Sequence, residues 1–352
     1  MIDVFYKIKA LHEAGCKIVL HCFDYGRGQQ DELLKYCTEV NYYPRKMSIA
    51  GLFSRLPYIV VSRNSAALLQ NLLKDEAAVL FEGLHSCYFL SNPLLKKKLK
   101  IVRTHNIEHD YYSNLAKSEK NLIKKFYFKR EAIKLKRFEN VLQQANKIAA
   151  ISANDTYHFK RNHPLVHTVS AFHPYNRVAI KEGLGNYALY HGNLAVAENN
   201  LGALYLVNEV FCHINFPLII AGSQPSRALK EAVKKYSHIT LKGDISTNEI
   251  NDLIENAHIN VLPTFQATGI KLKLLAALYS GRHCLVNNPM VANTGLEEIC
   301  IVKDSPLEMM KAIELLKNKE MDKQMIALRK TILEKSFSNQ YNASILMQMI
   351  TS

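Results

Sequence analysis

Residues 257–281 read AHINVLPTFQATGIKLKLLAALYSG and carry the clearest structural signals in the chain. The apolar run 259–262 predicts a strand, and Pro263 ends it because proline cannot donate to a ladder. A polar loop then closes on Thr268 and Gly269, and the apolar residues that follow have helical spacing. The stretch therefore predicts a strand, a loop and a helix in immediate succession.

The start of this helix predicts an anion-binding site. Free backbone N–H groups and the positive end of the helix dipole attract anions to a helix N-terminus. Lys271 and Lys273 lie in the first turns and add two positive charges. The simplest ligand is a phosphate or diphosphate. The alternative interpretation is a pair of solvated lysines on the flank of the helix.

The rest of the second half repeats the pattern of a short apolar strand beside a glycine. It occurs in YHGNL (190–194), LIIAGS (218–223), ITLKGD (239–244) and GRHCLV (281–286). In the first half we expect a helix at 4–14, strands at 17–23, 39–43, 78–81 and 100–104, a basic helix at 119–145 and a last strand at 147–151. Strands alternating with helices predict parallel sheets with ligand sites at the carboxyl ends of the strands.

On these motifs the chain resembles the GT-B glycosyltransferases, in particular the retaining family 4 (group 1) type. The resemblance implies an α/β fold of two Rossmann-like domains whose parallel sheets face a cleft. It assigns 1–170 to an acceptor-side domain, 171–186 to a linker, 187–327 to a nucleotide-sugar-binding domain and 328–352 to a helix that crosses back to the first domain.

The resemblance also implies roles for individual residues. Lys273, Lys271 and His105 are assigned to catalysis. The donor is expected to contact Gly192, Asn193, Gly222, Ser223, Gly243, Thr268, Gly269 and Ile270. The acceptor side is expected to include Glu82, Gly83 and Asn106. The transfer is expected to need no metal and no cofactor besides the nucleotide-sugar itself.

Simpler interpretations of the first-domain residues remain open. His105 follows the strand 100–104 and is expected to hydrogen-bond the sugar, yet a loop histidine capping the helix near Glu108 would give the same sequence. Glu82 could be an ordinary surface carboxylate. Asn200 is expected to open a helix, where it could serve as an N-cap.

Two departures from the family pattern stand out. In the resembled fold a strand and a glycine-rich loop precede the helix at 4–14, and this sequence shows neither. We therefore expect the first strand of the N-terminal domain to be missing from this chain. Ala276 stands where many members carry a glutamate that contacts the donor ribose, so that contact is not carried over.

The charge composition indicates which class of partner the chain favours. Lysine and arginine total 45 against 31 acidic residues, and the net charge of +14 favours anionic partners. No nucleic-acid motif is recognisable, so nucleic acid is not an expected partner. The helix at 119–145 is basic and amphipathic, which suits either an anionic membrane surface or a core-facing helix with a solvated face.

Cysteine and hydropathy patterns give the expected location. Seven scattered cysteines without a Cys-x-x-Cys pair indicate neither a disulfide framework nor a zinc site. No apolar run approaches the ~20 residues of a membrane span, and the start lacks the regions of a signal peptide. We expect a cytoplasmic protein, with contact to the inner face of the plasma membrane as an open alternative.

These observations predict a glycosyltransferase that moves a sugar, with retention, from a nucleotide-sugar to a saccharide or lipid-linked acceptor. Synthesis of cell-surface polysaccharide or glycolipid is the expected setting. A GT-B sugar-nucleotide epimerase or hydrolase, and a catalytically weak nucleotide- or carbohydrate-binding protein, are the alternatives. Donor turnover separates them, because a transferase needs an acceptor, an epimerase does not, and a binding protein releases no nucleotide.

Overall fold

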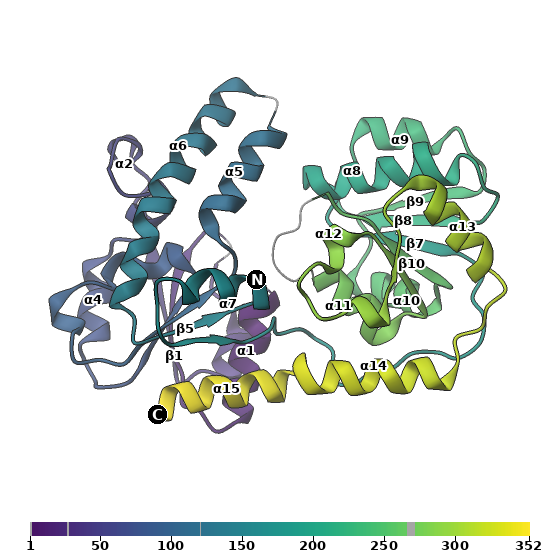
Figure 1. The fold of residues 1–352 in the computed structure, drawn as a ribbon. Helices are drawn as coiled ribbons and strands as arrows, with labels where there is room; N and C mark the ends of the chain where they lie inside the picture. Colours follow the sequence, from purple (N-terminus) through teal and green to yellow (C-terminus); the bar gives the residue numbers. More distant parts are fainter. Residues whose placement is uncertain (1, 27, 120, 266–271) are drawn as a thin grey trace. The chain divides into compact units, whose positions relative to one another are not determined.

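The computed structural model describes residues 2–26, 28–119, 121–265 and 272–352. The chain divides into two compact units, shown in Figure 1. The first comprises Met1–Pro174 together with Asn339–Ser352, and the second comprises Tyr175–Ser338. The first division thus falls within the stretch expected to be a linker, and the return to the first unit comes at Asn339 rather than at residue 328.

The strands of the first unit form two parallel sheets. Four strands pair in the order β3 (Val79–Glu82), β4 (Lys100–Thr104), β5 (Lys147–Ala150) and β6 (Val166–Thr168). β1 (Val19–Asp24) and β2 (Glu39–Pro44) pair in register with each other in a separate sheet. The expected strands are confirmed, but the expectation that residues 147–151 form the last strand is wrong, because β6 follows β5 and pairs with it.

Alternate residues of the central strands pack into two hydrophobic clusters. Val102 and Ile148 pack in a cluster with Leu135, whereas Ile101 and Ala149 pack on the opposite face. That second face is covered by α1 (Ile2–Glu13) and α15 (Asn339–Thr351). Because successive side chains of a strand point to opposite faces, a sheet covered on both sides buries apolar side chains on each face, as Ile101 and Val102 of β4 do.

The long basic helix expected at 119–145 is shorter in the structure. It is divided into α6 (Leu122–Phe138) and a 3₁₀ turn, η4 (Glu139–Gln144), and α5 (Glu108–Ser118) precedes it. Asn121 begins α6, since its side chain accepts from the Ile123 and Lys124 amides at 3.0 and 3.1 Å. α5 and α6 form a hairpin that projects from the sheet (Figure 1).

The apolar residues of α6 do not all face the core, which corrects one of the two interpretations of this helix. Leu135 is fully buried, and Leu142 of η4 is 4% exposed. Leu122, Ile123 and Phe126, in the projecting half, are 80, 82 and 68% exposed. The first unit is completed by α2 (Ile49–Leu52), α3 (Tyr58–Val61), α4 (Ala66–Leu72), α7 (Ala153–Lys160) and 3₁₀ turns at Asp31–Lys35, Leu84–Phe89 and Pro93–Leu95.

The second unit is built on one six-stranded parallel sheet. Its order is β12 (Ile301–Val302), β11 (His283–Val286), β10 (Ile259–Leu262), β7 (Ala188–His191), β8 (Leu218–Gly222) and β9 (Ile239–Gly243). The five expected strands are confirmed, and β12 was not foreseen. All residues of β7, β10 and β11 are buried, as is typical of a parallel sheet covered by helices on both faces.

Helices and short turns connect these strands. They are α8 (Ala197–Tyr205), a π-helical turn η5 (Leu206–Phe211), α9 (Arg227–Val233), α10 (Thr247–Asn256), α11 (Leu272–Ser280), α12 (Asn288–Val291), η6 (Glu297–Ile299), α13 (Pro306–Leu316) and α14 (Lys323–Ser336). α8 begins at Ala197 with Val196 as its N-cap, so the expectation that Asn200 opens this helix is wrong. Within the described ranges, no helix combines the length and the apolar character needed to cross a bilayer.

Candidate active site

The strand order of the second unit determines where a ligand would bind. From β7 the chain moves outward through β8 and β9 on one side, and later from β10 through β11 and β12 on the other. β7 and β10 are therefore hydrogen-bonded neighbours that belong to opposite runs. In open α/β sheets, ligands bind at the carboxyl ends of the strands where the direction reverses. Here that place lies beyond His191 and Leu262.

The loop after β7 lies against the end of β8, and this contact requires glycine. A Cβ atom on Gly222 would meet the Gly192 carbonyl oxygen at 1.8 Å, so no other residue fits without a backbone shift. The Ser223 hydroxyl donates to Asn193 Oδ1 at 3.2 Å. Gly243 is the register partner of Gly222 on β9. The structure therefore brings together the five donor residues expected between positions 192 and 243.

Lys273 joins this group from the first turn of α11. Its Nζ donates to Asn199 Oδ1 at 2.9 Å and to the Tyr190 hydroxyl at 3.4 Å. The Asn199 amide in turn donates to the Asn193 carbonyl at 3.0 Å. The ammonium is thus fixed beside the loop after β7 by an amide and a phenol. Thr268, Gly269, Ile270 and Lys271 lie outside the described residues.

Three further residues of the second unit have no role assigned from the sequence. Tyr190 and Asn199 hold Lys273, and His191 lies at the end of β7. Among the described residues, the buried Nε2 of His191 has no hydrogen-bond partner. Burial, followed by the charge of Lys273, lowers the pKa of His191 to about 3, so the imidazole is neutral. The burial of His191 could not be predicted, because a histidine at a strand end looks the same in a sequence whether it is buried or exposed.

The loop after β10 is fixed by side-chain hydrogen bonds. The Thr264 amide donates to Asn287 Oδ1 at 3.0 Å, and the Asn287 amide returns a bond to the Thr264 carbonyl at 2.7 Å. The Thr264 hydroxyl also donates to the carboxylate of Glu198 on α8. This loop and the loop after β7 are therefore connected through α8.

A second polar cluster lies at the carboxyl ends of β3 and β4 in the first unit. Glu82 accepts a hydrogen bond from the His105 ring and forms an ion pair with Lys7 of α1. Arg103 Nε lies 3.9 Å from Glu82, and Arg103 Nη2 forms an ion pair with Asp3 at 3.0 Å. Asp3, Lys7 and Arg103 were missed by the sequence analysis, because α1 and β4 are far apart in the chain and each reads as ordinary secondary structure.

Burial controls the charges of this cluster. It lowers the pKa of His105 to about 4 and that of Lys7 to about 7, although the neighbouring Asp3 carboxylate opposes both shifts. Burial alone would raise the pKa of Asp3, but Arg103 and Lys7 outweigh it and hold that pKa at about 2. At neutral pH His105 is therefore a neutral imidazole within a network of paired charges.

The structure decides whether His105 caps a helix and whether Glu82 is an ordinary surface carboxylate. Ile107 occupies the N-cap position of α5 and makes no side-chain cap, while the His105 ring bonds Glu82, so the histidine is not the cap of this helix. The Glu82 side chain is 24% exposed and held by charged partners, unlike a free surface carboxylate. Gly83 follows with a φ of +78°, a conformation that favours glycine. Asn106 lies next to His105 and is half-buried.

Solved structures similar to this chain share its whole architecture. HepE from Anabaena, in complex with UDP and glucose, matches with a TM-score of 0.65 and 10% identity over 99% of this chain and 95% of its own. A glycosyltransferase from Rickettsia africae matches with a TM-score of 0.60 and 10% identity, over 99 and 93% of the two chains. The chain has the GT-B fold.

The GT-B fold confirms the resemblance at the level of architecture. TarM matches with a TM-score of 0.61 and 13% identity over 84% of this chain, which spans 58% of the length of TarM. No family model matches the sequence. A curated relative, described as an uncharacterized 44.6 kDa protein in the cps region of Klebsiella pneumoniae, is 26% identical over 339 residues, covering 90% of this chain and 87% of its own. At these identities the solved structures show the fold, and the reaction has to be argued from the residues.

Proposed function

We propose that this GT-B chain is a glycosyltransferase that takes a sugar from a nucleotide-sugar and transfers it, with retention, to a saccharide or lipid-linked acceptor. The observation that carries the proposal is the position of the Lys273 side chain. Its ammonium is fixed by Asn199 and Tyr190 at the place where the direction of the second sheet reverses. A diphosphate is the part of a nucleotide-sugar that needs such a cation.

The similar proteins support this choice of substrate. HepE was solved with UDP and glucose, and a TarM variant was solved with UDP and α-GlcNAc-glycerol. The location of the Klebsiella relative in a cps region supports a role in surface polysaccharide synthesis. We therefore propose a nucleotide diphosphate sugar as donor and a glycan or lipid-linked glycan as acceptor, handled on the cytoplasmic side.

The proposed chemistry assigns each group a separate task. As the glycosidic bond breaks, the leaving nucleotide diphosphate gains negative charge, and a preorganised cation with backbone N–H donors stabilises it more than it stabilises the ground state. Lys273 would supply that charge without a metal. The neutral His105 ring can donate or accept a hydrogen bond to sugar hydroxyls, and Glu82 positions the ring.

The geometry disfavours an epimerase. Such an enzyme normally uses a carboxylate as base, and Glu82 ends β3 in the cluster of the first unit. Lys7 and His105 already bind it, and Arg103 adds a further positive charge. Its carboxylate oxygens therefore already have partners within the protein.

The test is the acceptor dependence of nucleotide release. The chain is incubated with UDP-, GDP- and ADP-sugars, each with and without a pool of oligosaccharide and lipid-linked acceptors, and released nucleotide and glycan products are quantified. We expect release from one donor class that rises with acceptor and gives a product of retained configuration. Acceptor-independent conversion of the sugar would instead identify an epimerase or hydrolase, and binding without release would identify a binding protein.

We also propose that the tip of the α5–α6 hairpin contacts an anionic membrane. The exposed Leu122, Ile123 and Phe126 lie beside Lys124 and Lys125 on the same helical turns. Apolar side chains next to lysines suit the interface of anionic lipids, where basic residues near the surface contribute ~1 kcal/mol each. A lipid-linked acceptor would be presented at such a surface.

Vesicle flotation tests this contact. We expect binding to phosphatidylglycerol vesicles and none to phosphatidylcholine vesicles, with loss of binding in the double variant Ile123→Ser/Phe126→Ser. Leu315→Ser is the matched control, because Leu315 is 79% exposed on α13 of the other unit. Equal binding of both variants would contradict the assignment.

A further inference from the structure

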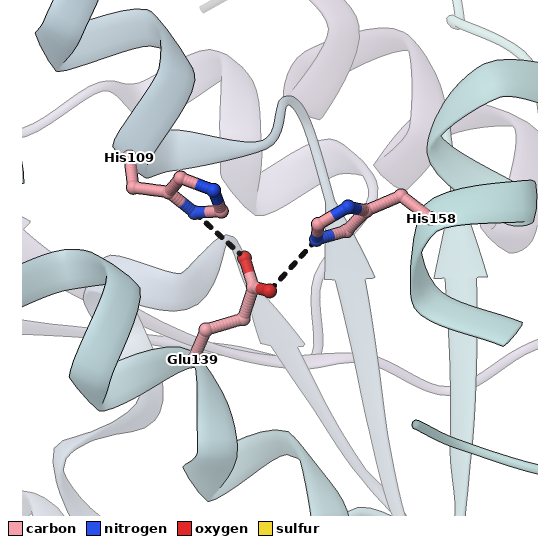
Figure 2. Close-up of side chains that lie close together, drawn as sticks. All are labelled: His109, Glu139 and His158. Atoms are coloured by element: carbon pink, nitrogen blue, oxygen red, sulfur yellow. Dashed lines mark hydrogen bonds and ion pairs between the residues drawn. The ribbon is translucent and has the colours of Figure 1, made fainter. Parts of the chain in front are cut away.

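Two histidines and a glutamate from three separate elements converge in the first unit, in a cluster that does not include Glu82 or His105 (Figure 2). His109 lies in the first turn of α5, Glu139 begins η4, and His158 lies in α7. His109 Nδ1 is 3.2 Å from Glu139 Oε2, and His158 Nε2 is 2.7 Å from Glu139 Oε1. Each carboxylate oxygen therefore faces one imidazole nitrogen.

The spacing of these atoms fits one small metal ion. One ligand atom from each residue can be chosen so that all three lie within 4.8 Å of one another. Ligands bound tetrahedrally to zinc at 2.0–2.2 Å lie about 3.3 Å apart. The nitrogen–oxygen distances of 3.2 and 2.7 Å go to different oxygens of Glu139, so the side chains have to adjust until one carboxylate oxygen and both imidazole nitrogens reach this spacing.

The charges around the cluster favour a cation. Among the described residues, the Glu139 carboxylate pairs with the two histidines and has no lysine or arginine within ion-pair distance. The Asp110 carboxylate lies 3.6 Å from His109 Nε2 and adds negative charge. Asp155, one turn before His158 on α7, is buried, and its Oδ2 atom has no hydrogen-bond partner in the described part of the chain.

The first unit contains a second group of potential metal ligands for comparison. Asp3, Glu82 and His105 also bring potential ligand atoms within 4.8 Å of one another. There, however, Lys7 and Arg103 form ion pairs with the two carboxylates and occupy the positions of a cation. Of these two clusters, the one formed by His109, Glu139 and His158 has no lysine or arginine paired with its carboxylate in the described part of the chain.

We propose that His109, Glu139 and His158 bind one zinc ion, with water completing a tetrahedral site. Imidazole nitrogens select zinc and similar transition metals over magnesium and calcium, which prefer oxygen ligands. The three ligands come from α5, η4 and α7, so the ion ties these elements together. Because α5 begins just after His105, the site holds the helix that follows this candidate sugar-contacting residue. The proposal does not depend on the glycosyltransferase assignment.

Metal titration of the whole chain tests the site. Protein freed of metal with a chelator, and then of the chelator, is titrated with Zn²⁺ by calorimetry and with Co²⁺ as a spectroscopic probe. We expect one tight equivalent of Zn²⁺ and a tetrahedral Co²⁺ spectrum. His158→Gln and Glu139→Gln should each weaken binding more than ~100-fold, since even outer-shell substitutions cost ~10–100-fold.

The matched control is His167→Gln, because His167 is an exposed histidine on β6 of the same unit. It should bind Zn²⁺ like the unaltered protein. Circular dichroism establishes that each variant is folded, and His109→Gln provides a third ligand variant if one of the others is not. Unchanged Zn²⁺ affinity in the folded ligand variants, absence of a tight equivalent, or a thiolate-to-cobalt charge-transfer band from the free cysteines would each overturn the proposal.

Discussion

The two candidate half-sites differ in how their polar groups are held. In the second unit, Lys273 is fixed by an amide and a phenol beside a glycine contact, on a continuous six-stranded sheet. In the first unit, Glu82 and Asp3 are paired with Lys7 and Arg103, beside a sheet that is divided in two. In the first unit two cations pair directly with two carboxylates, whereas in the second unit a cation is hydrogen-bonded to side chains of β7 and α8 at the place where the sheet reverses direction.

This difference predicts different consequences for removing a charge. Lys273 lies where the direction of the second sheet reverses, which is where ligands of such sheets bind, so the loss of its charge should appear mainly in ligand binding and turnover. Removing a cation from the buried ion pairs of the first unit leaves its carboxylate partner charged in a poorly solvated place, which costs stability. The first unit should therefore respond mainly in stability, and the second mainly in activity.

The largest effect is expected for Lys273→Ala. Loss of a preorganised charge at the leaving group should lower turnover by ~10²–10³-fold, while the free energy of unfolding changes little. Steady-state kinetics and urea unfolding measure the two quantities. Lys311→Ala, an exposed lysine of α13, is the control and should match the unaltered protein in both. Normal kinetics in Lys273→Ala would remove this lysine from the mechanism.

A smaller effect, on stability instead, is expected for Lys7→Met. The Lys7 side chain is 3% exposed, and its removal leaves Glu82 with less compensation. We expect the free energy of unfolding to fall by ~3 kcal/mol, the lower end for a broken buried pair. Lys234→Met, which removes an exposed pair with Glu231, should cost under ~1 kcal/mol. Equal costs in the two variants would show that the first cluster is not held by its ion pairs.

The smallest effect is a shared sensitivity to acid. In the folded chain the pKa of His105 is about 4 and that of His191 is about 3, both below the ordinary value of 6.5. Between the folded-state pKa and 6.5, each of these histidines is protonated in the unfolded chain and neutral in the folded chain. Above pH ~6.5 these two histidines do not change the free energy of unfolding with pH. Below pH ~6.5 each of them lowers it by ~1.4 kcal/mol for every pH unit. Urea unfolding at pH 7.5 and 5.5 should show a smaller loss in His105→Asn than in the control His213→Asn, whose histidine is exposed. The same loss in both variants would contradict the burial of His105.

The sequence predicted the strands whose signals are local. Residues 100–104 contain the apolar pair Ile101-Val102, residues 259–262 are mainly apolar, and polar or proline-containing loops follow them; both segments are strands in the structure. β6 and β12 have three and two residues, too few for a pattern, and exist because a neighbouring strand pairs with them. Short edge strands of this kind depend on tertiary contacts that a local pattern does not contain.

The candidate sites show the same limit. Gly192, Gly222 and Ser223 could be grouped from the sequence because loops after neighbouring parallel strands meet at one edge of a sheet. The partners of Glu82 could not, because Lys7 reaches it from α1 and no motif links them. The exposure of Phe126 was equally hidden, since an amphipathic pattern fits both a core-facing and a projecting helix.

Hydrogen exchange tests most directly whether the donor site lies at Lys273, because a bound nucleotide diphosphate should protect the backbone that it contacts. The chain is labelled with and without saturating UDP, GDP or ADP, and protection is mapped by mass spectrometry. We expect one nucleotide to protect residues 192–200 and the start of α11 in the second unit, with no protection in Lys273→Ala at the same concentration. Protection confined to the strand ends at Glu82 and His105, or protection by none of the three nucleotides, would contradict a donor site built around Lys273.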